Sequence, residues 1–310
     1  MAVSRVLSPP VATGVLLVAL PLVFVSDYAH SVLVQFCVML LLLTGLDFIN
    51  GHARMISLAQ AGLYGLGAYT AGILSARSIL PPVLAFVCAP LLVTVVALLI
   101  GSASLRLRAT YFTMATLAAG YVLYLLFGRL TWLTGGPNGL LGIPPLGEAV
   151  SGTTAMYVLA AALAFLGVLV AHNVASSRAG RALRALGSSE PAAVASGVPA
   201  YRLRLFAFGL SGCYAGVAGA LQTFHDTFVS PSSFGFFTAV LFVVGLTVGG
   251  AGRPTGPLIG AALLTGLSQL GTEYAGFESL IVGVVFLVAV QAFPDGVGGL
   301  TARLAPRRAR

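Results

Sequence analysis

The feature that most constrains this chain is its near-continuous apolarity, which only short polar intervals interrupt. Charged residues make up 8% of the sequence, whereas soluble domains carry about 25%. A globule with so little polar surface would not be solvated in water. The chain is therefore predicted to be a polytopic membrane protein.

The apolar runs are long enough to cross a bilayer as helices, which takes about 20 residues each. They lack the alternation of polar and apolar residues that is typical of barrel strands. We therefore expect an all-α fold of about ten transmembrane helices in a single transmembrane domain, 1–310. The predicted spans are 11–26, 31–49, 57–76, 82–103, 110–128, 153–172, 205–224, 235–250, 256–271 and 278–293.

The charges predict how these spans are oriented. All 16 basic residues are arginines, and the formal net charge is +8. If the N-terminus lies in the cytoplasm and the spans alternate, every arginine except Arg77 and Arg129 falls on the cytoplasmic side. Both termini are then cytoplasmic, including a tail over 294–310. Because this bias accounts for the basic composition, we expect contacts with membrane lipid and none with nucleic acid.

The longest polar island, 173–204, is predicted to be a cytoplasmic loop. Arg178, Arg181 and Arg184 recur at three-residue spacing and so share one helical face. Ser188 or Ser189 is then predicted to cap a short helix whose first turn holds an acid and a proline, and which a glycine ends. Glu190 and Pro191 stand in its first turn, Ala192, Ala193, Val194 and Ala195 form its body, and Gly197 ends it.

A helix of about two turns is not stable alone. It makes physical sense if it docks into a groove on another protein. The alternative is an ordinary amphipathic surface loop.

A second polar region begins at Gly51 and is rich in glycine, hydroxyl and amide groups. It predicts a broken or tightly packed helix beside a transport pathway, or else a plain turn followed by a packed helix. The candidate pathway residues are Ser57, Gln60, Tyr64, Tyr69, Thr113 and Thr116.

Asp47 lies near the end of the second predicted span, where a carboxylate is costly. It is interpreted either as an interfacial partner of Arg54 or as a gate or pathway group. The cysteines lie in apolar runs, the histidines are scattered and no phosphate-binding G-x-x-x-x-G-K-[ST] motif is present. We therefore expect no catalytic, metal or cofactor site on this chain.

The polar island GRALRALGSSEPAAVASGV resembles the "EAA" loop of the membrane subunits of ABC importers. Further motifs follow the order found in LivM-type permeases of branched-chain amino acid importers, and the resemblance covers roughly residues 30–295. These motifs are SLAQAGLYGLGAYTAG, LRLRATYFTMATLA, TGGPNGLLGIP, FGLSGCYAGVAGAL and LTVGGAGRPTGPLIGAALL.

This resemblance implies a type II architecture, like that of vitamin B12 and ribose permeases, in a bacterial inner membrane. It also implies a homologous LivH-type permease, two cytoplasmic ATPases and an extracytoplasmic binding protein as partners. The short helix would be the coupling helix that the ATPases move. Its implied coupling residues are Arg181, Arg184, Glu190, Pro191, Ala192, Ala193 and Gly197.

The chain departs from the family at Arg54 and Met55, where relatives often have Gly-Gln. This departure leaves the substrate open between branched-chain amino acids and other small solutes, such as urea or short amides. An ATP-independent secondary carrier would need a relay of ionisable groups inside the membrane. Only Asp47 is near such a position.

Overall fold

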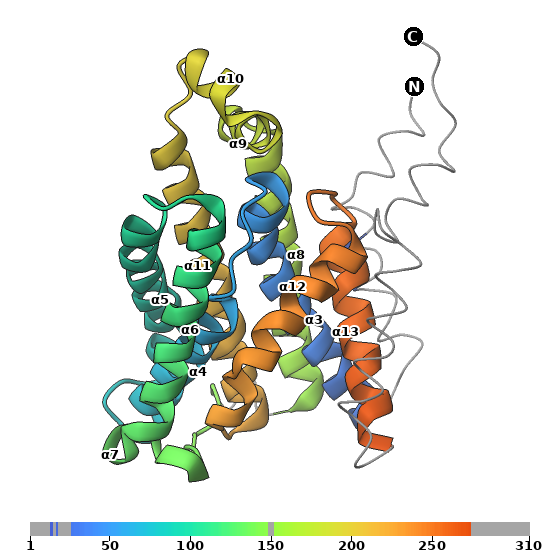
Figure 1. The fold of residues 1–310 in the computed structure, drawn as a ribbon. Helices are drawn as coiled ribbons and strands as arrows, with labels where there is room; N and C mark the ends of the chain where they lie inside the picture. The colour runs from blue at the N-terminus through green and yellow to red at the C-terminus, as the bar shows by residue number, and fades with distance from the viewer. Residues whose placement is uncertain (1–12, 15–16, 18–25, 148–151, 274–310) are drawn as a thin grey trace, which may run out of the picture.

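The computed structural model describes residues 13–14, 17, 26–147 and 152–273 (Figure 1). Over these residues the chain is helical and forms no strand; one isolated antiparallel bridge joins Leu140 to Val229. The prediction of an all-α fold is confirmed for this part. The last predicted span, the predicted tail and most of the first predicted span lie outside the described residues.

The long helices of the described part fall on the remaining predicted spans, with ends that differ by a few residues. They are α3 (Asp27–Asp47), α4 (Gln60–Ala76), α5 (Pro82–Ser104), α6 (Ala109–Arg129), α8 (Thr153–Ser176), α11 (Ala200–Asp226), α12 (Phe236–Gly249) and α13 (Gly256–Glu273). The shorter elements are η1 (Phe48–His52), α7 (Thr131–Thr134), η2 (Gly136–Asn138), α9 (Arg178–Ser188), α10 (Glu190–Ala195) and η4 (Pro231–Phe234).

Five helices of the described part are long and apolar enough to cross a membrane, which makes the chain a multi-pass membrane protein. They are Asp27–His52, Pro82–Ser104, Thr110–Arg129, Thr153–Ser176 and Ala200–Asp226. The count of ten spans and the type II arrangement stay predictions.

The connections alternate between the two ends of the bundle (Figure 1). α9, α10 and the α12–α13 loop lie at one end, here called the α10 end. The α4–α5 turn and α7 lie at the other, here called the α7 end. Segments predicted to be cytoplasmic therefore gather at the α10 end, as the alternation of spans requires.

The burial of the helices explains why the sequence is apolar almost everywhere. In α3 and α11, 83% and 67% of the most apolar stretch is buried inside the chain, against 22% in α5 and 28% in α6 and α8. The central pair is therefore apolar because it packs against protein. The outer helices expose large apolar side chains, such as Leu91 at 63% and Val158 at 61%, which suit lipid or another membrane subunit.

Glycines set the closest helix contacts, because lipid gives no hydrophobic drive for helices to associate and small residues let their backbones meet. A Cβ atom on Gly67 of α4 would lie 2.8 Å from the Cα of Gly216 on α11. A Cβ on Gly260 of α13 would lie 2.6 Å from the carbonyl oxygen of Gly245 on α12. Small-residue spacing in α11 and α12 thus corresponds to tight packing.

The third predicted span begins later than expected. Residues 54–59 are not helical, and α4 starts at Gln60 rather than at Ser57. Non-helical backbone at this depth is tolerated only where protein groups satisfy it. The side chains that do so are part of the candidate site.

Candidate coupling helix and transport site

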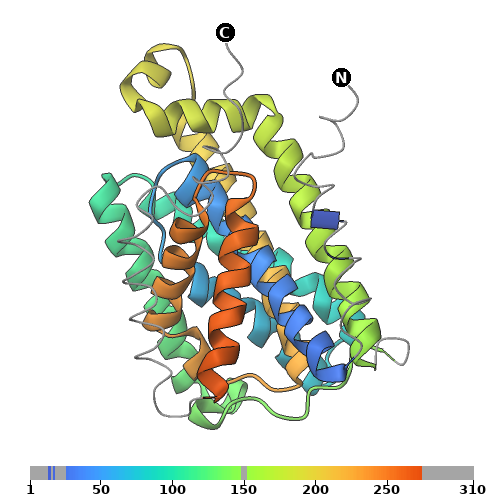
Figure 2. The same ribbon diagram turned by 90° about the vertical axis from the view of Figure 1, so that its right-hand side faces the viewer.

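α9 lies across the end of the bundle, crosswise to α8 (Figure 2). Ser177 caps it by accepting a hydrogen bond from the backbone N–H of Gly180 at 3.3 Å. Arg181 donates to the carbonyl oxygen of Ser176 at 2.6 Å, and Arg184 to that of Ala175 at 2.8 Å. Both cations thus bind the last carbonyls of α8, where a helix end favours positive charge. These two predicted coupling residues fix the α8–α9 corner.

α10 is the short helix that the sequence predicts, and it is the outermost element of the α10 end (Figure 1). Ser189 occupies its N-cap position in extended conformation, although its hydroxyl makes no capping bond. Pro191 stands in its first turn, and Gly197 beyond its end has φ +84°, where glycine is favoured. Among its residues Ala193 is buried, whereas Val194 is 50% exposed. Most of the surface of α10 is therefore exposed.

A bidentate ion pair ties α10 to the second turn of α11. Arg204 donates from its two terminal nitrogens to the two carboxylate oxygens of Glu190, each at 2.8 Å. The Arg204 side chain is 13% exposed and that of Glu190 51%. From the sequence, Arg204 is predicted only to be one of the arginines on the cytoplasmic side. The partners are 14 residues apart, and the turn that joins α10 to α11 brings them together.

The pH dependence of this ion pair gives a first prediction. Hydrogen bonds from Arg204 lower the pKa of Glu190 below its ordinary value of 4.5. A lowered pKa means that the stabilisation is complete above pH 4.5 and is lost as the pH falls through the folded-state value. Because Glu190 is half exposed, we expect less than about 1 kcal/mol.

Amide hydrogen exchange in α10, corrected for its intrinsic pH dependence, measures the effect. The wild type should hold its protection from pH 7 to pH 5 and lose part of it below pH 4.5. Glu190→Gln should show the reduced protection already at pH 7. Identical protection in the two proteins at pH 7 would mean that the pair does not hold α10.

The non-helical residues 54–59 are held by side chains from other elements. Thr116 of α6 accepts a hydrogen bond from the backbone N–H of Leu58 at 3.3 Å, and Thr113 donates to the carbonyl oxygen of Ile56 at 2.9 Å. The backbone N–H of Ser57 donates to Asn50 Oδ1 at 2.9 Å. Three candidate pathway residues therefore meet here and satisfy an irregular backbone.

Gln60 joins three helices at the start of α4. Its amide nitrogen donates to the carbonyl oxygen of Leu42 at 3.2 Å, and its amide oxygen accepts from the Ser211 hydroxyl at 2.9 Å. Tyr69 lies further along α4, with its ring stacked on Phe127 at a centroid distance of 4.7 Å. The structure thus separates the candidate residues into a cluster around Gln60 and the pair Tyr64 and Tyr69. Their roles in transport stay predictions.

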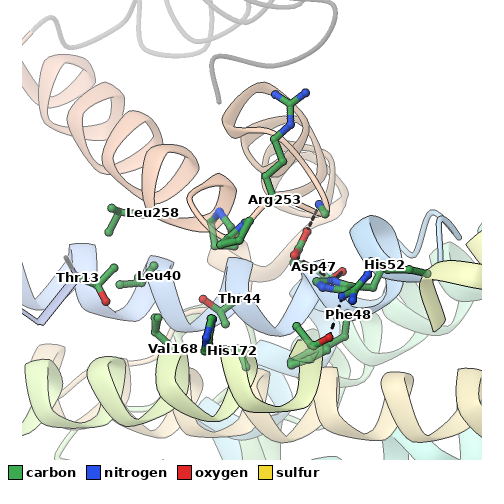
Figure 3. Close-up of a pocket in the computed structure, with 16 residues that line it drawn as sticks. Thr13, Leu40, Thr44, Asp47, Phe48, His52, Val168, His172, Arg253 and Leu258 are labelled. Carbon is green, nitrogen blue, oxygen red and sulfur yellow. Dashed lines mark hydrogen bonds and ion pairs between the residues drawn. The ribbon is translucent and has the colours of Figure 1, made fainter. Parts of the chain in front are cut away.

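Asp47 does not pair with Arg54, so that interpretation is wrong. One carboxylate oxygen lies 3.3 Å from His52 Nδ1, and the other accepts from the backbone N–H of Gly252 at 2.7 Å (Figure 3). Asp47 meets His52 rather than Arg54 because η1 is a π-helical turn, which brings together residues that are five apart in the sequence. The gate interpretation of Asp47 stays a prediction.

The contacts around Asp47 define the η1 junction, formed by η1, α9 and the α12–α13 loop. A Cβ atom on Gly51 would overlap Asp47 Oδ1 and the backbone nitrogen of Gly252. A Cβ atom on Gly187 of α9 would lie 2.7 Å from the carbonyl oxygen of His52. η1 is thus wedged between the segment that carries α10 and the loop that begins α13. A cavity of about 280 Å³ borders the junction, and Thr44, Arg184 and His172 are among its lining residues.

The backbone conformation at Arg54 bears on the departure from the family motif. Its φ is +51°, in the left-handed region that favours glycine, the residue that the family resemblance implies at this position. Met55 beside it is buried. Both residues lie at the α10 end, next to α9, since Arg54 Cγ would contact a side chain on Gly187. The departure therefore affects the η1 junction.

Comparison with known proteins places the chain. A family model described as the permease component of branched-chain amino acid transport systems matches residues 28–290. LivM, a high-affinity branched-chain amino acid transport permease of Escherichia coli K12, is 28% identical over 94% of this chain and 74% of its own length. LivM of Salmonella typhimurium LT2 is 29% identical over 83% of this chain and 67% of its own length.

A shorter stretch is similar to the ribose import permease RbsC of Escherichia coli K12, at 31% identity over 37% of this chain and 38% of that protein. No solved structure matches the chain. The family model covers most of the described helices, including α10 and the η1 junction. The chain therefore belongs to the family of permease components of branched-chain amino acid transport systems.

Proposed function

We propose that this chain is the membrane subunit of an ATP-driven importer and forms part of the route by which branched-chain or related small amino acids cross the bacterial inner membrane. In this proposal the α10 end faces the cytoplasm. The α7 end faces the binding protein that delivers substrate. The arginine bias of the α10 end supports this orientation.

The observation that carries the proposal is α10 itself. It projects from the bundle and exposes most of its surface (Figure 1). It is fixed at its base by the Glu190–Arg204 ion pair and by Arg181 and Arg184 of α9, which bind the last carbonyls of α8. A short rigid helix on a fixed base is suited to enter a groove on a partner. The chain lacks a phosphate-binding motif. We therefore assign the partner as one of two cytoplasmic ATPases.

The η1 junction offers a route for the movement. α9 contacts η1 at Gly187, and Asp47, the last residue of α3 before η1, binds the α12–α13 loop at Gly252. A displacement of α10 by the ATPases would therefore reach α3 and α13 without crossing the lipid-facing helices. Rocking of packed helices about a fixed site is how alternating access works in many transporters.

A second permease of the LivH type would complete the transport path. The exposed apolar faces of α5, α6 and α8 are available for it and for lipid. Ser57, Gln60, Thr113 and Thr116 would hold the backbone beside this path, and Tyr64 and Tyr69 would line or support it towards the α7 end.

Val194→Asp tests the docking of α10. Val194 is half exposed and lies on the free side of α10, whereas Ala193 is buried and its replacement would disturb the helix itself. A carboxylate in an apolar groove is left unsolvated, so we expect capture of the ATPases to fall by about tenfold or more. Co-purification of the ATPases with the chain measures this.

Ile79→Asp is the matched control, because Ile79 is 58% exposed in the α4–α5 turn at the opposite end. It should capture the ATPases as the wild type does. Equal capture by Val194→Asp and the wild type would remove α10 from the ATPase contact.

A further inference from the structure

Two adjoining cavities open at the α7 end, where α3 begins and α11 ends. Their volumes are about 270 and 230 Å³, and both are lined by Gln35, Gln222 and Asp226. Typical pockets for drug-sized ligands measure about 300–1,000 Å³. The shared residues join the two spaces into one site, here called the α7-end cavity, which suits a small solute.

One wall of the α7-end cavity is rich in acceptors. The Gln222 amide nitrogen donates to Asp226 Oδ2 at 2.6 Å, whereas the Gln222 amide oxygen is buried without a hydrogen-bond partner. A buried acceptor left without a donor costs about 1–3 kcal/mol. Among the described residues that line the cavity none is an arginine, and the one basic side chain is that of His225 beside Asp226. The carboxylate of Asp226 and the oxygen of Gln222 therefore favour a ligand that brings its own positive donor, such as an ammonium group.

Other lining residues, from α3, α13 and the segment after α11, offer neutral donors. Tyr28 donates to Gln269 Oε1 at 2.7 Å, and Gln269 Nε2 donates to Gln35 Oε1 at 3.0 Å. Because the Gln35 amide oxygen is engaged, its nitrogen is the end that is left to donate. The hydroxyls of Ser230 and Ser233 line the same site. Such neutral donors can bind a carboxylate without holding it as an arginine would.

The inner end of the α7-end cavity is apolar. Val229, Phe242 and Tyr64 line it, with exposures of 3%, 2% and 5%. Burying an aliphatic side chain here is favourable by about 25 cal/mol per Å². An acceptor wall, a set of neutral donors and an apolar floor together match the three parts of an aliphatic amino acid.

We infer that the α7-end cavity binds an aliphatic α-amino acid, with its ammonium at Asp226 and Gln222, its carboxylate at the amide and hydroxyl donors, and its side chain on the apolar floor. The inference rests on the proposed function for its biological meaning. It makes the α7 end of this single subunit a substrate entry site. It also gives Tyr64, a candidate pathway residue, a place in the route.

Equilibrium binding of tritiated L-leucine to the full chain in lipid nanodiscs tests the site. We expect saturable binding by the wild type and about tenfold or more weaker binding by Asp226→Asn, because a charge-assisted contact is lost. Asp226→Glu keeps the charge and should restore most of the affinity. Asp27→Asn removes an acid at the same end that does not line the cavity, and it should bind like the wild type.

Two leucine analogues separate the parts of the site. 3-Methylbutylamine keeps the ammonium and should compete with leucine, whereas 4-methylpentanoate lacks it and should compete about tenfold less well. No saturable leucine binding by the wild type would overturn the inference. Unchanged binding by Asp226→Asn, or equal competition by the two analogues, would also overturn it.

The Val194→Asp chain separates this inference from the proposed function, because it should bind leucine normally while losing the ATPases. ATPase capture by a wild-type chain that binds no leucine would refute the cavity alone. Leucine binding by a wild-type chain that captures no ATPase would refute the coupling role alone.

Discussion

Asp47→Ala is expected to lower coupled uptake by about tenfold or more while the chain still inserts into the membrane. Asp47 is 5% exposed and bonds both His52 and the backbone N–H of Gly252. Removing the carboxylate leaves the His52 ring and the Gly252 N–H without this acceptor, and an unsatisfied buried polar group costs about 1–3 kcal/mol. That cost falls on the η1 junction, which links α9 to the α12–α13 loop.

Uptake and ATP hydrolysis should therefore separate in this variant. Proteoliposomes that contain the assembled transporter allow both to be measured on one sample. ATP hydrolysis should persist, since α10 is intact, whereas leucine uptake should fall. Asp47→Asn, which can still accept from Gly252, should lie between the variant and the wild type. Wild-type uptake by Asp47→Ala would show that the junction does not transmit the movement of α10.

Gly219→Val is expected to separate α4 from α11 and so to destabilise the whole bundle. A Cβ atom on Gly219 would overlap the carbonyl oxygen of Tyr64 and lie 2.7 Å from the backbone nitrogen of Ala68. Backbone atoms cannot turn aside as a flexible side chain can. Overpacking costs about 1–3 kcal/mol even where side chains adjust, so we expect the upper part of that range or more.

The melting temperature of the chain in detergent, followed by the loss of the monodisperse peak, measures this effect. Gly128→Val in α6 is the matched control, since a Cβ atom there meets nothing within 4 Å. The control should melt close to the wild type and Gly219→Val well below it. Equal melting of the two variants would mean that the α4–α11 contact is looser than the structure has it.

The parts of the molecule that could be predicted are those whose causes lie close together in the sequence. Apolar runs of membrane length fix the long helices. Ser189, Pro191 and Gly197 mark the start and end of α10, because capping and helix termination depend on neighbouring residues. The arginine distribution predicts which connections share an end of the bundle.

The parts that escaped prediction depend on contacts between distant residues. The backbone of Leu58 is held by Thr116, 58 residues away. Local sequence therefore gives no reason to start the helix at Gln60 rather than at Ser57. Asp47 accepts a hydrogen bond from Gly252, 205 residues away, and a π-helical turn places His52 beside it. Propensity does not predict such a turn, which depends on tertiary packing.

One part of the α7-end cavity could have been predicted from the sequence. Gln222 and Asp226 lie four residues apart at the end of a predicted span, so that they share a helical face. An amide and a carboxylate on one face beside the membrane boundary are costly unless they bind something. What the sequence could not supply is the set of neutral donors, because Gln35 and Gln269 come from opposite ends of the chain.

The central claim is that this chain imports an amino acid only when ATP is hydrolysed by partners that hold α10. Reconstitution of the chain with its partner permease, ATPases and binding protein, followed by measurement of tritiated leucine uptake with and without ATP, tests it most directly. The account predicts uptake against a gradient that needs ATP and is lost with Val194→Asp. Equal uptake without ATP, or by this chain alone under an ion gradient, would contradict it.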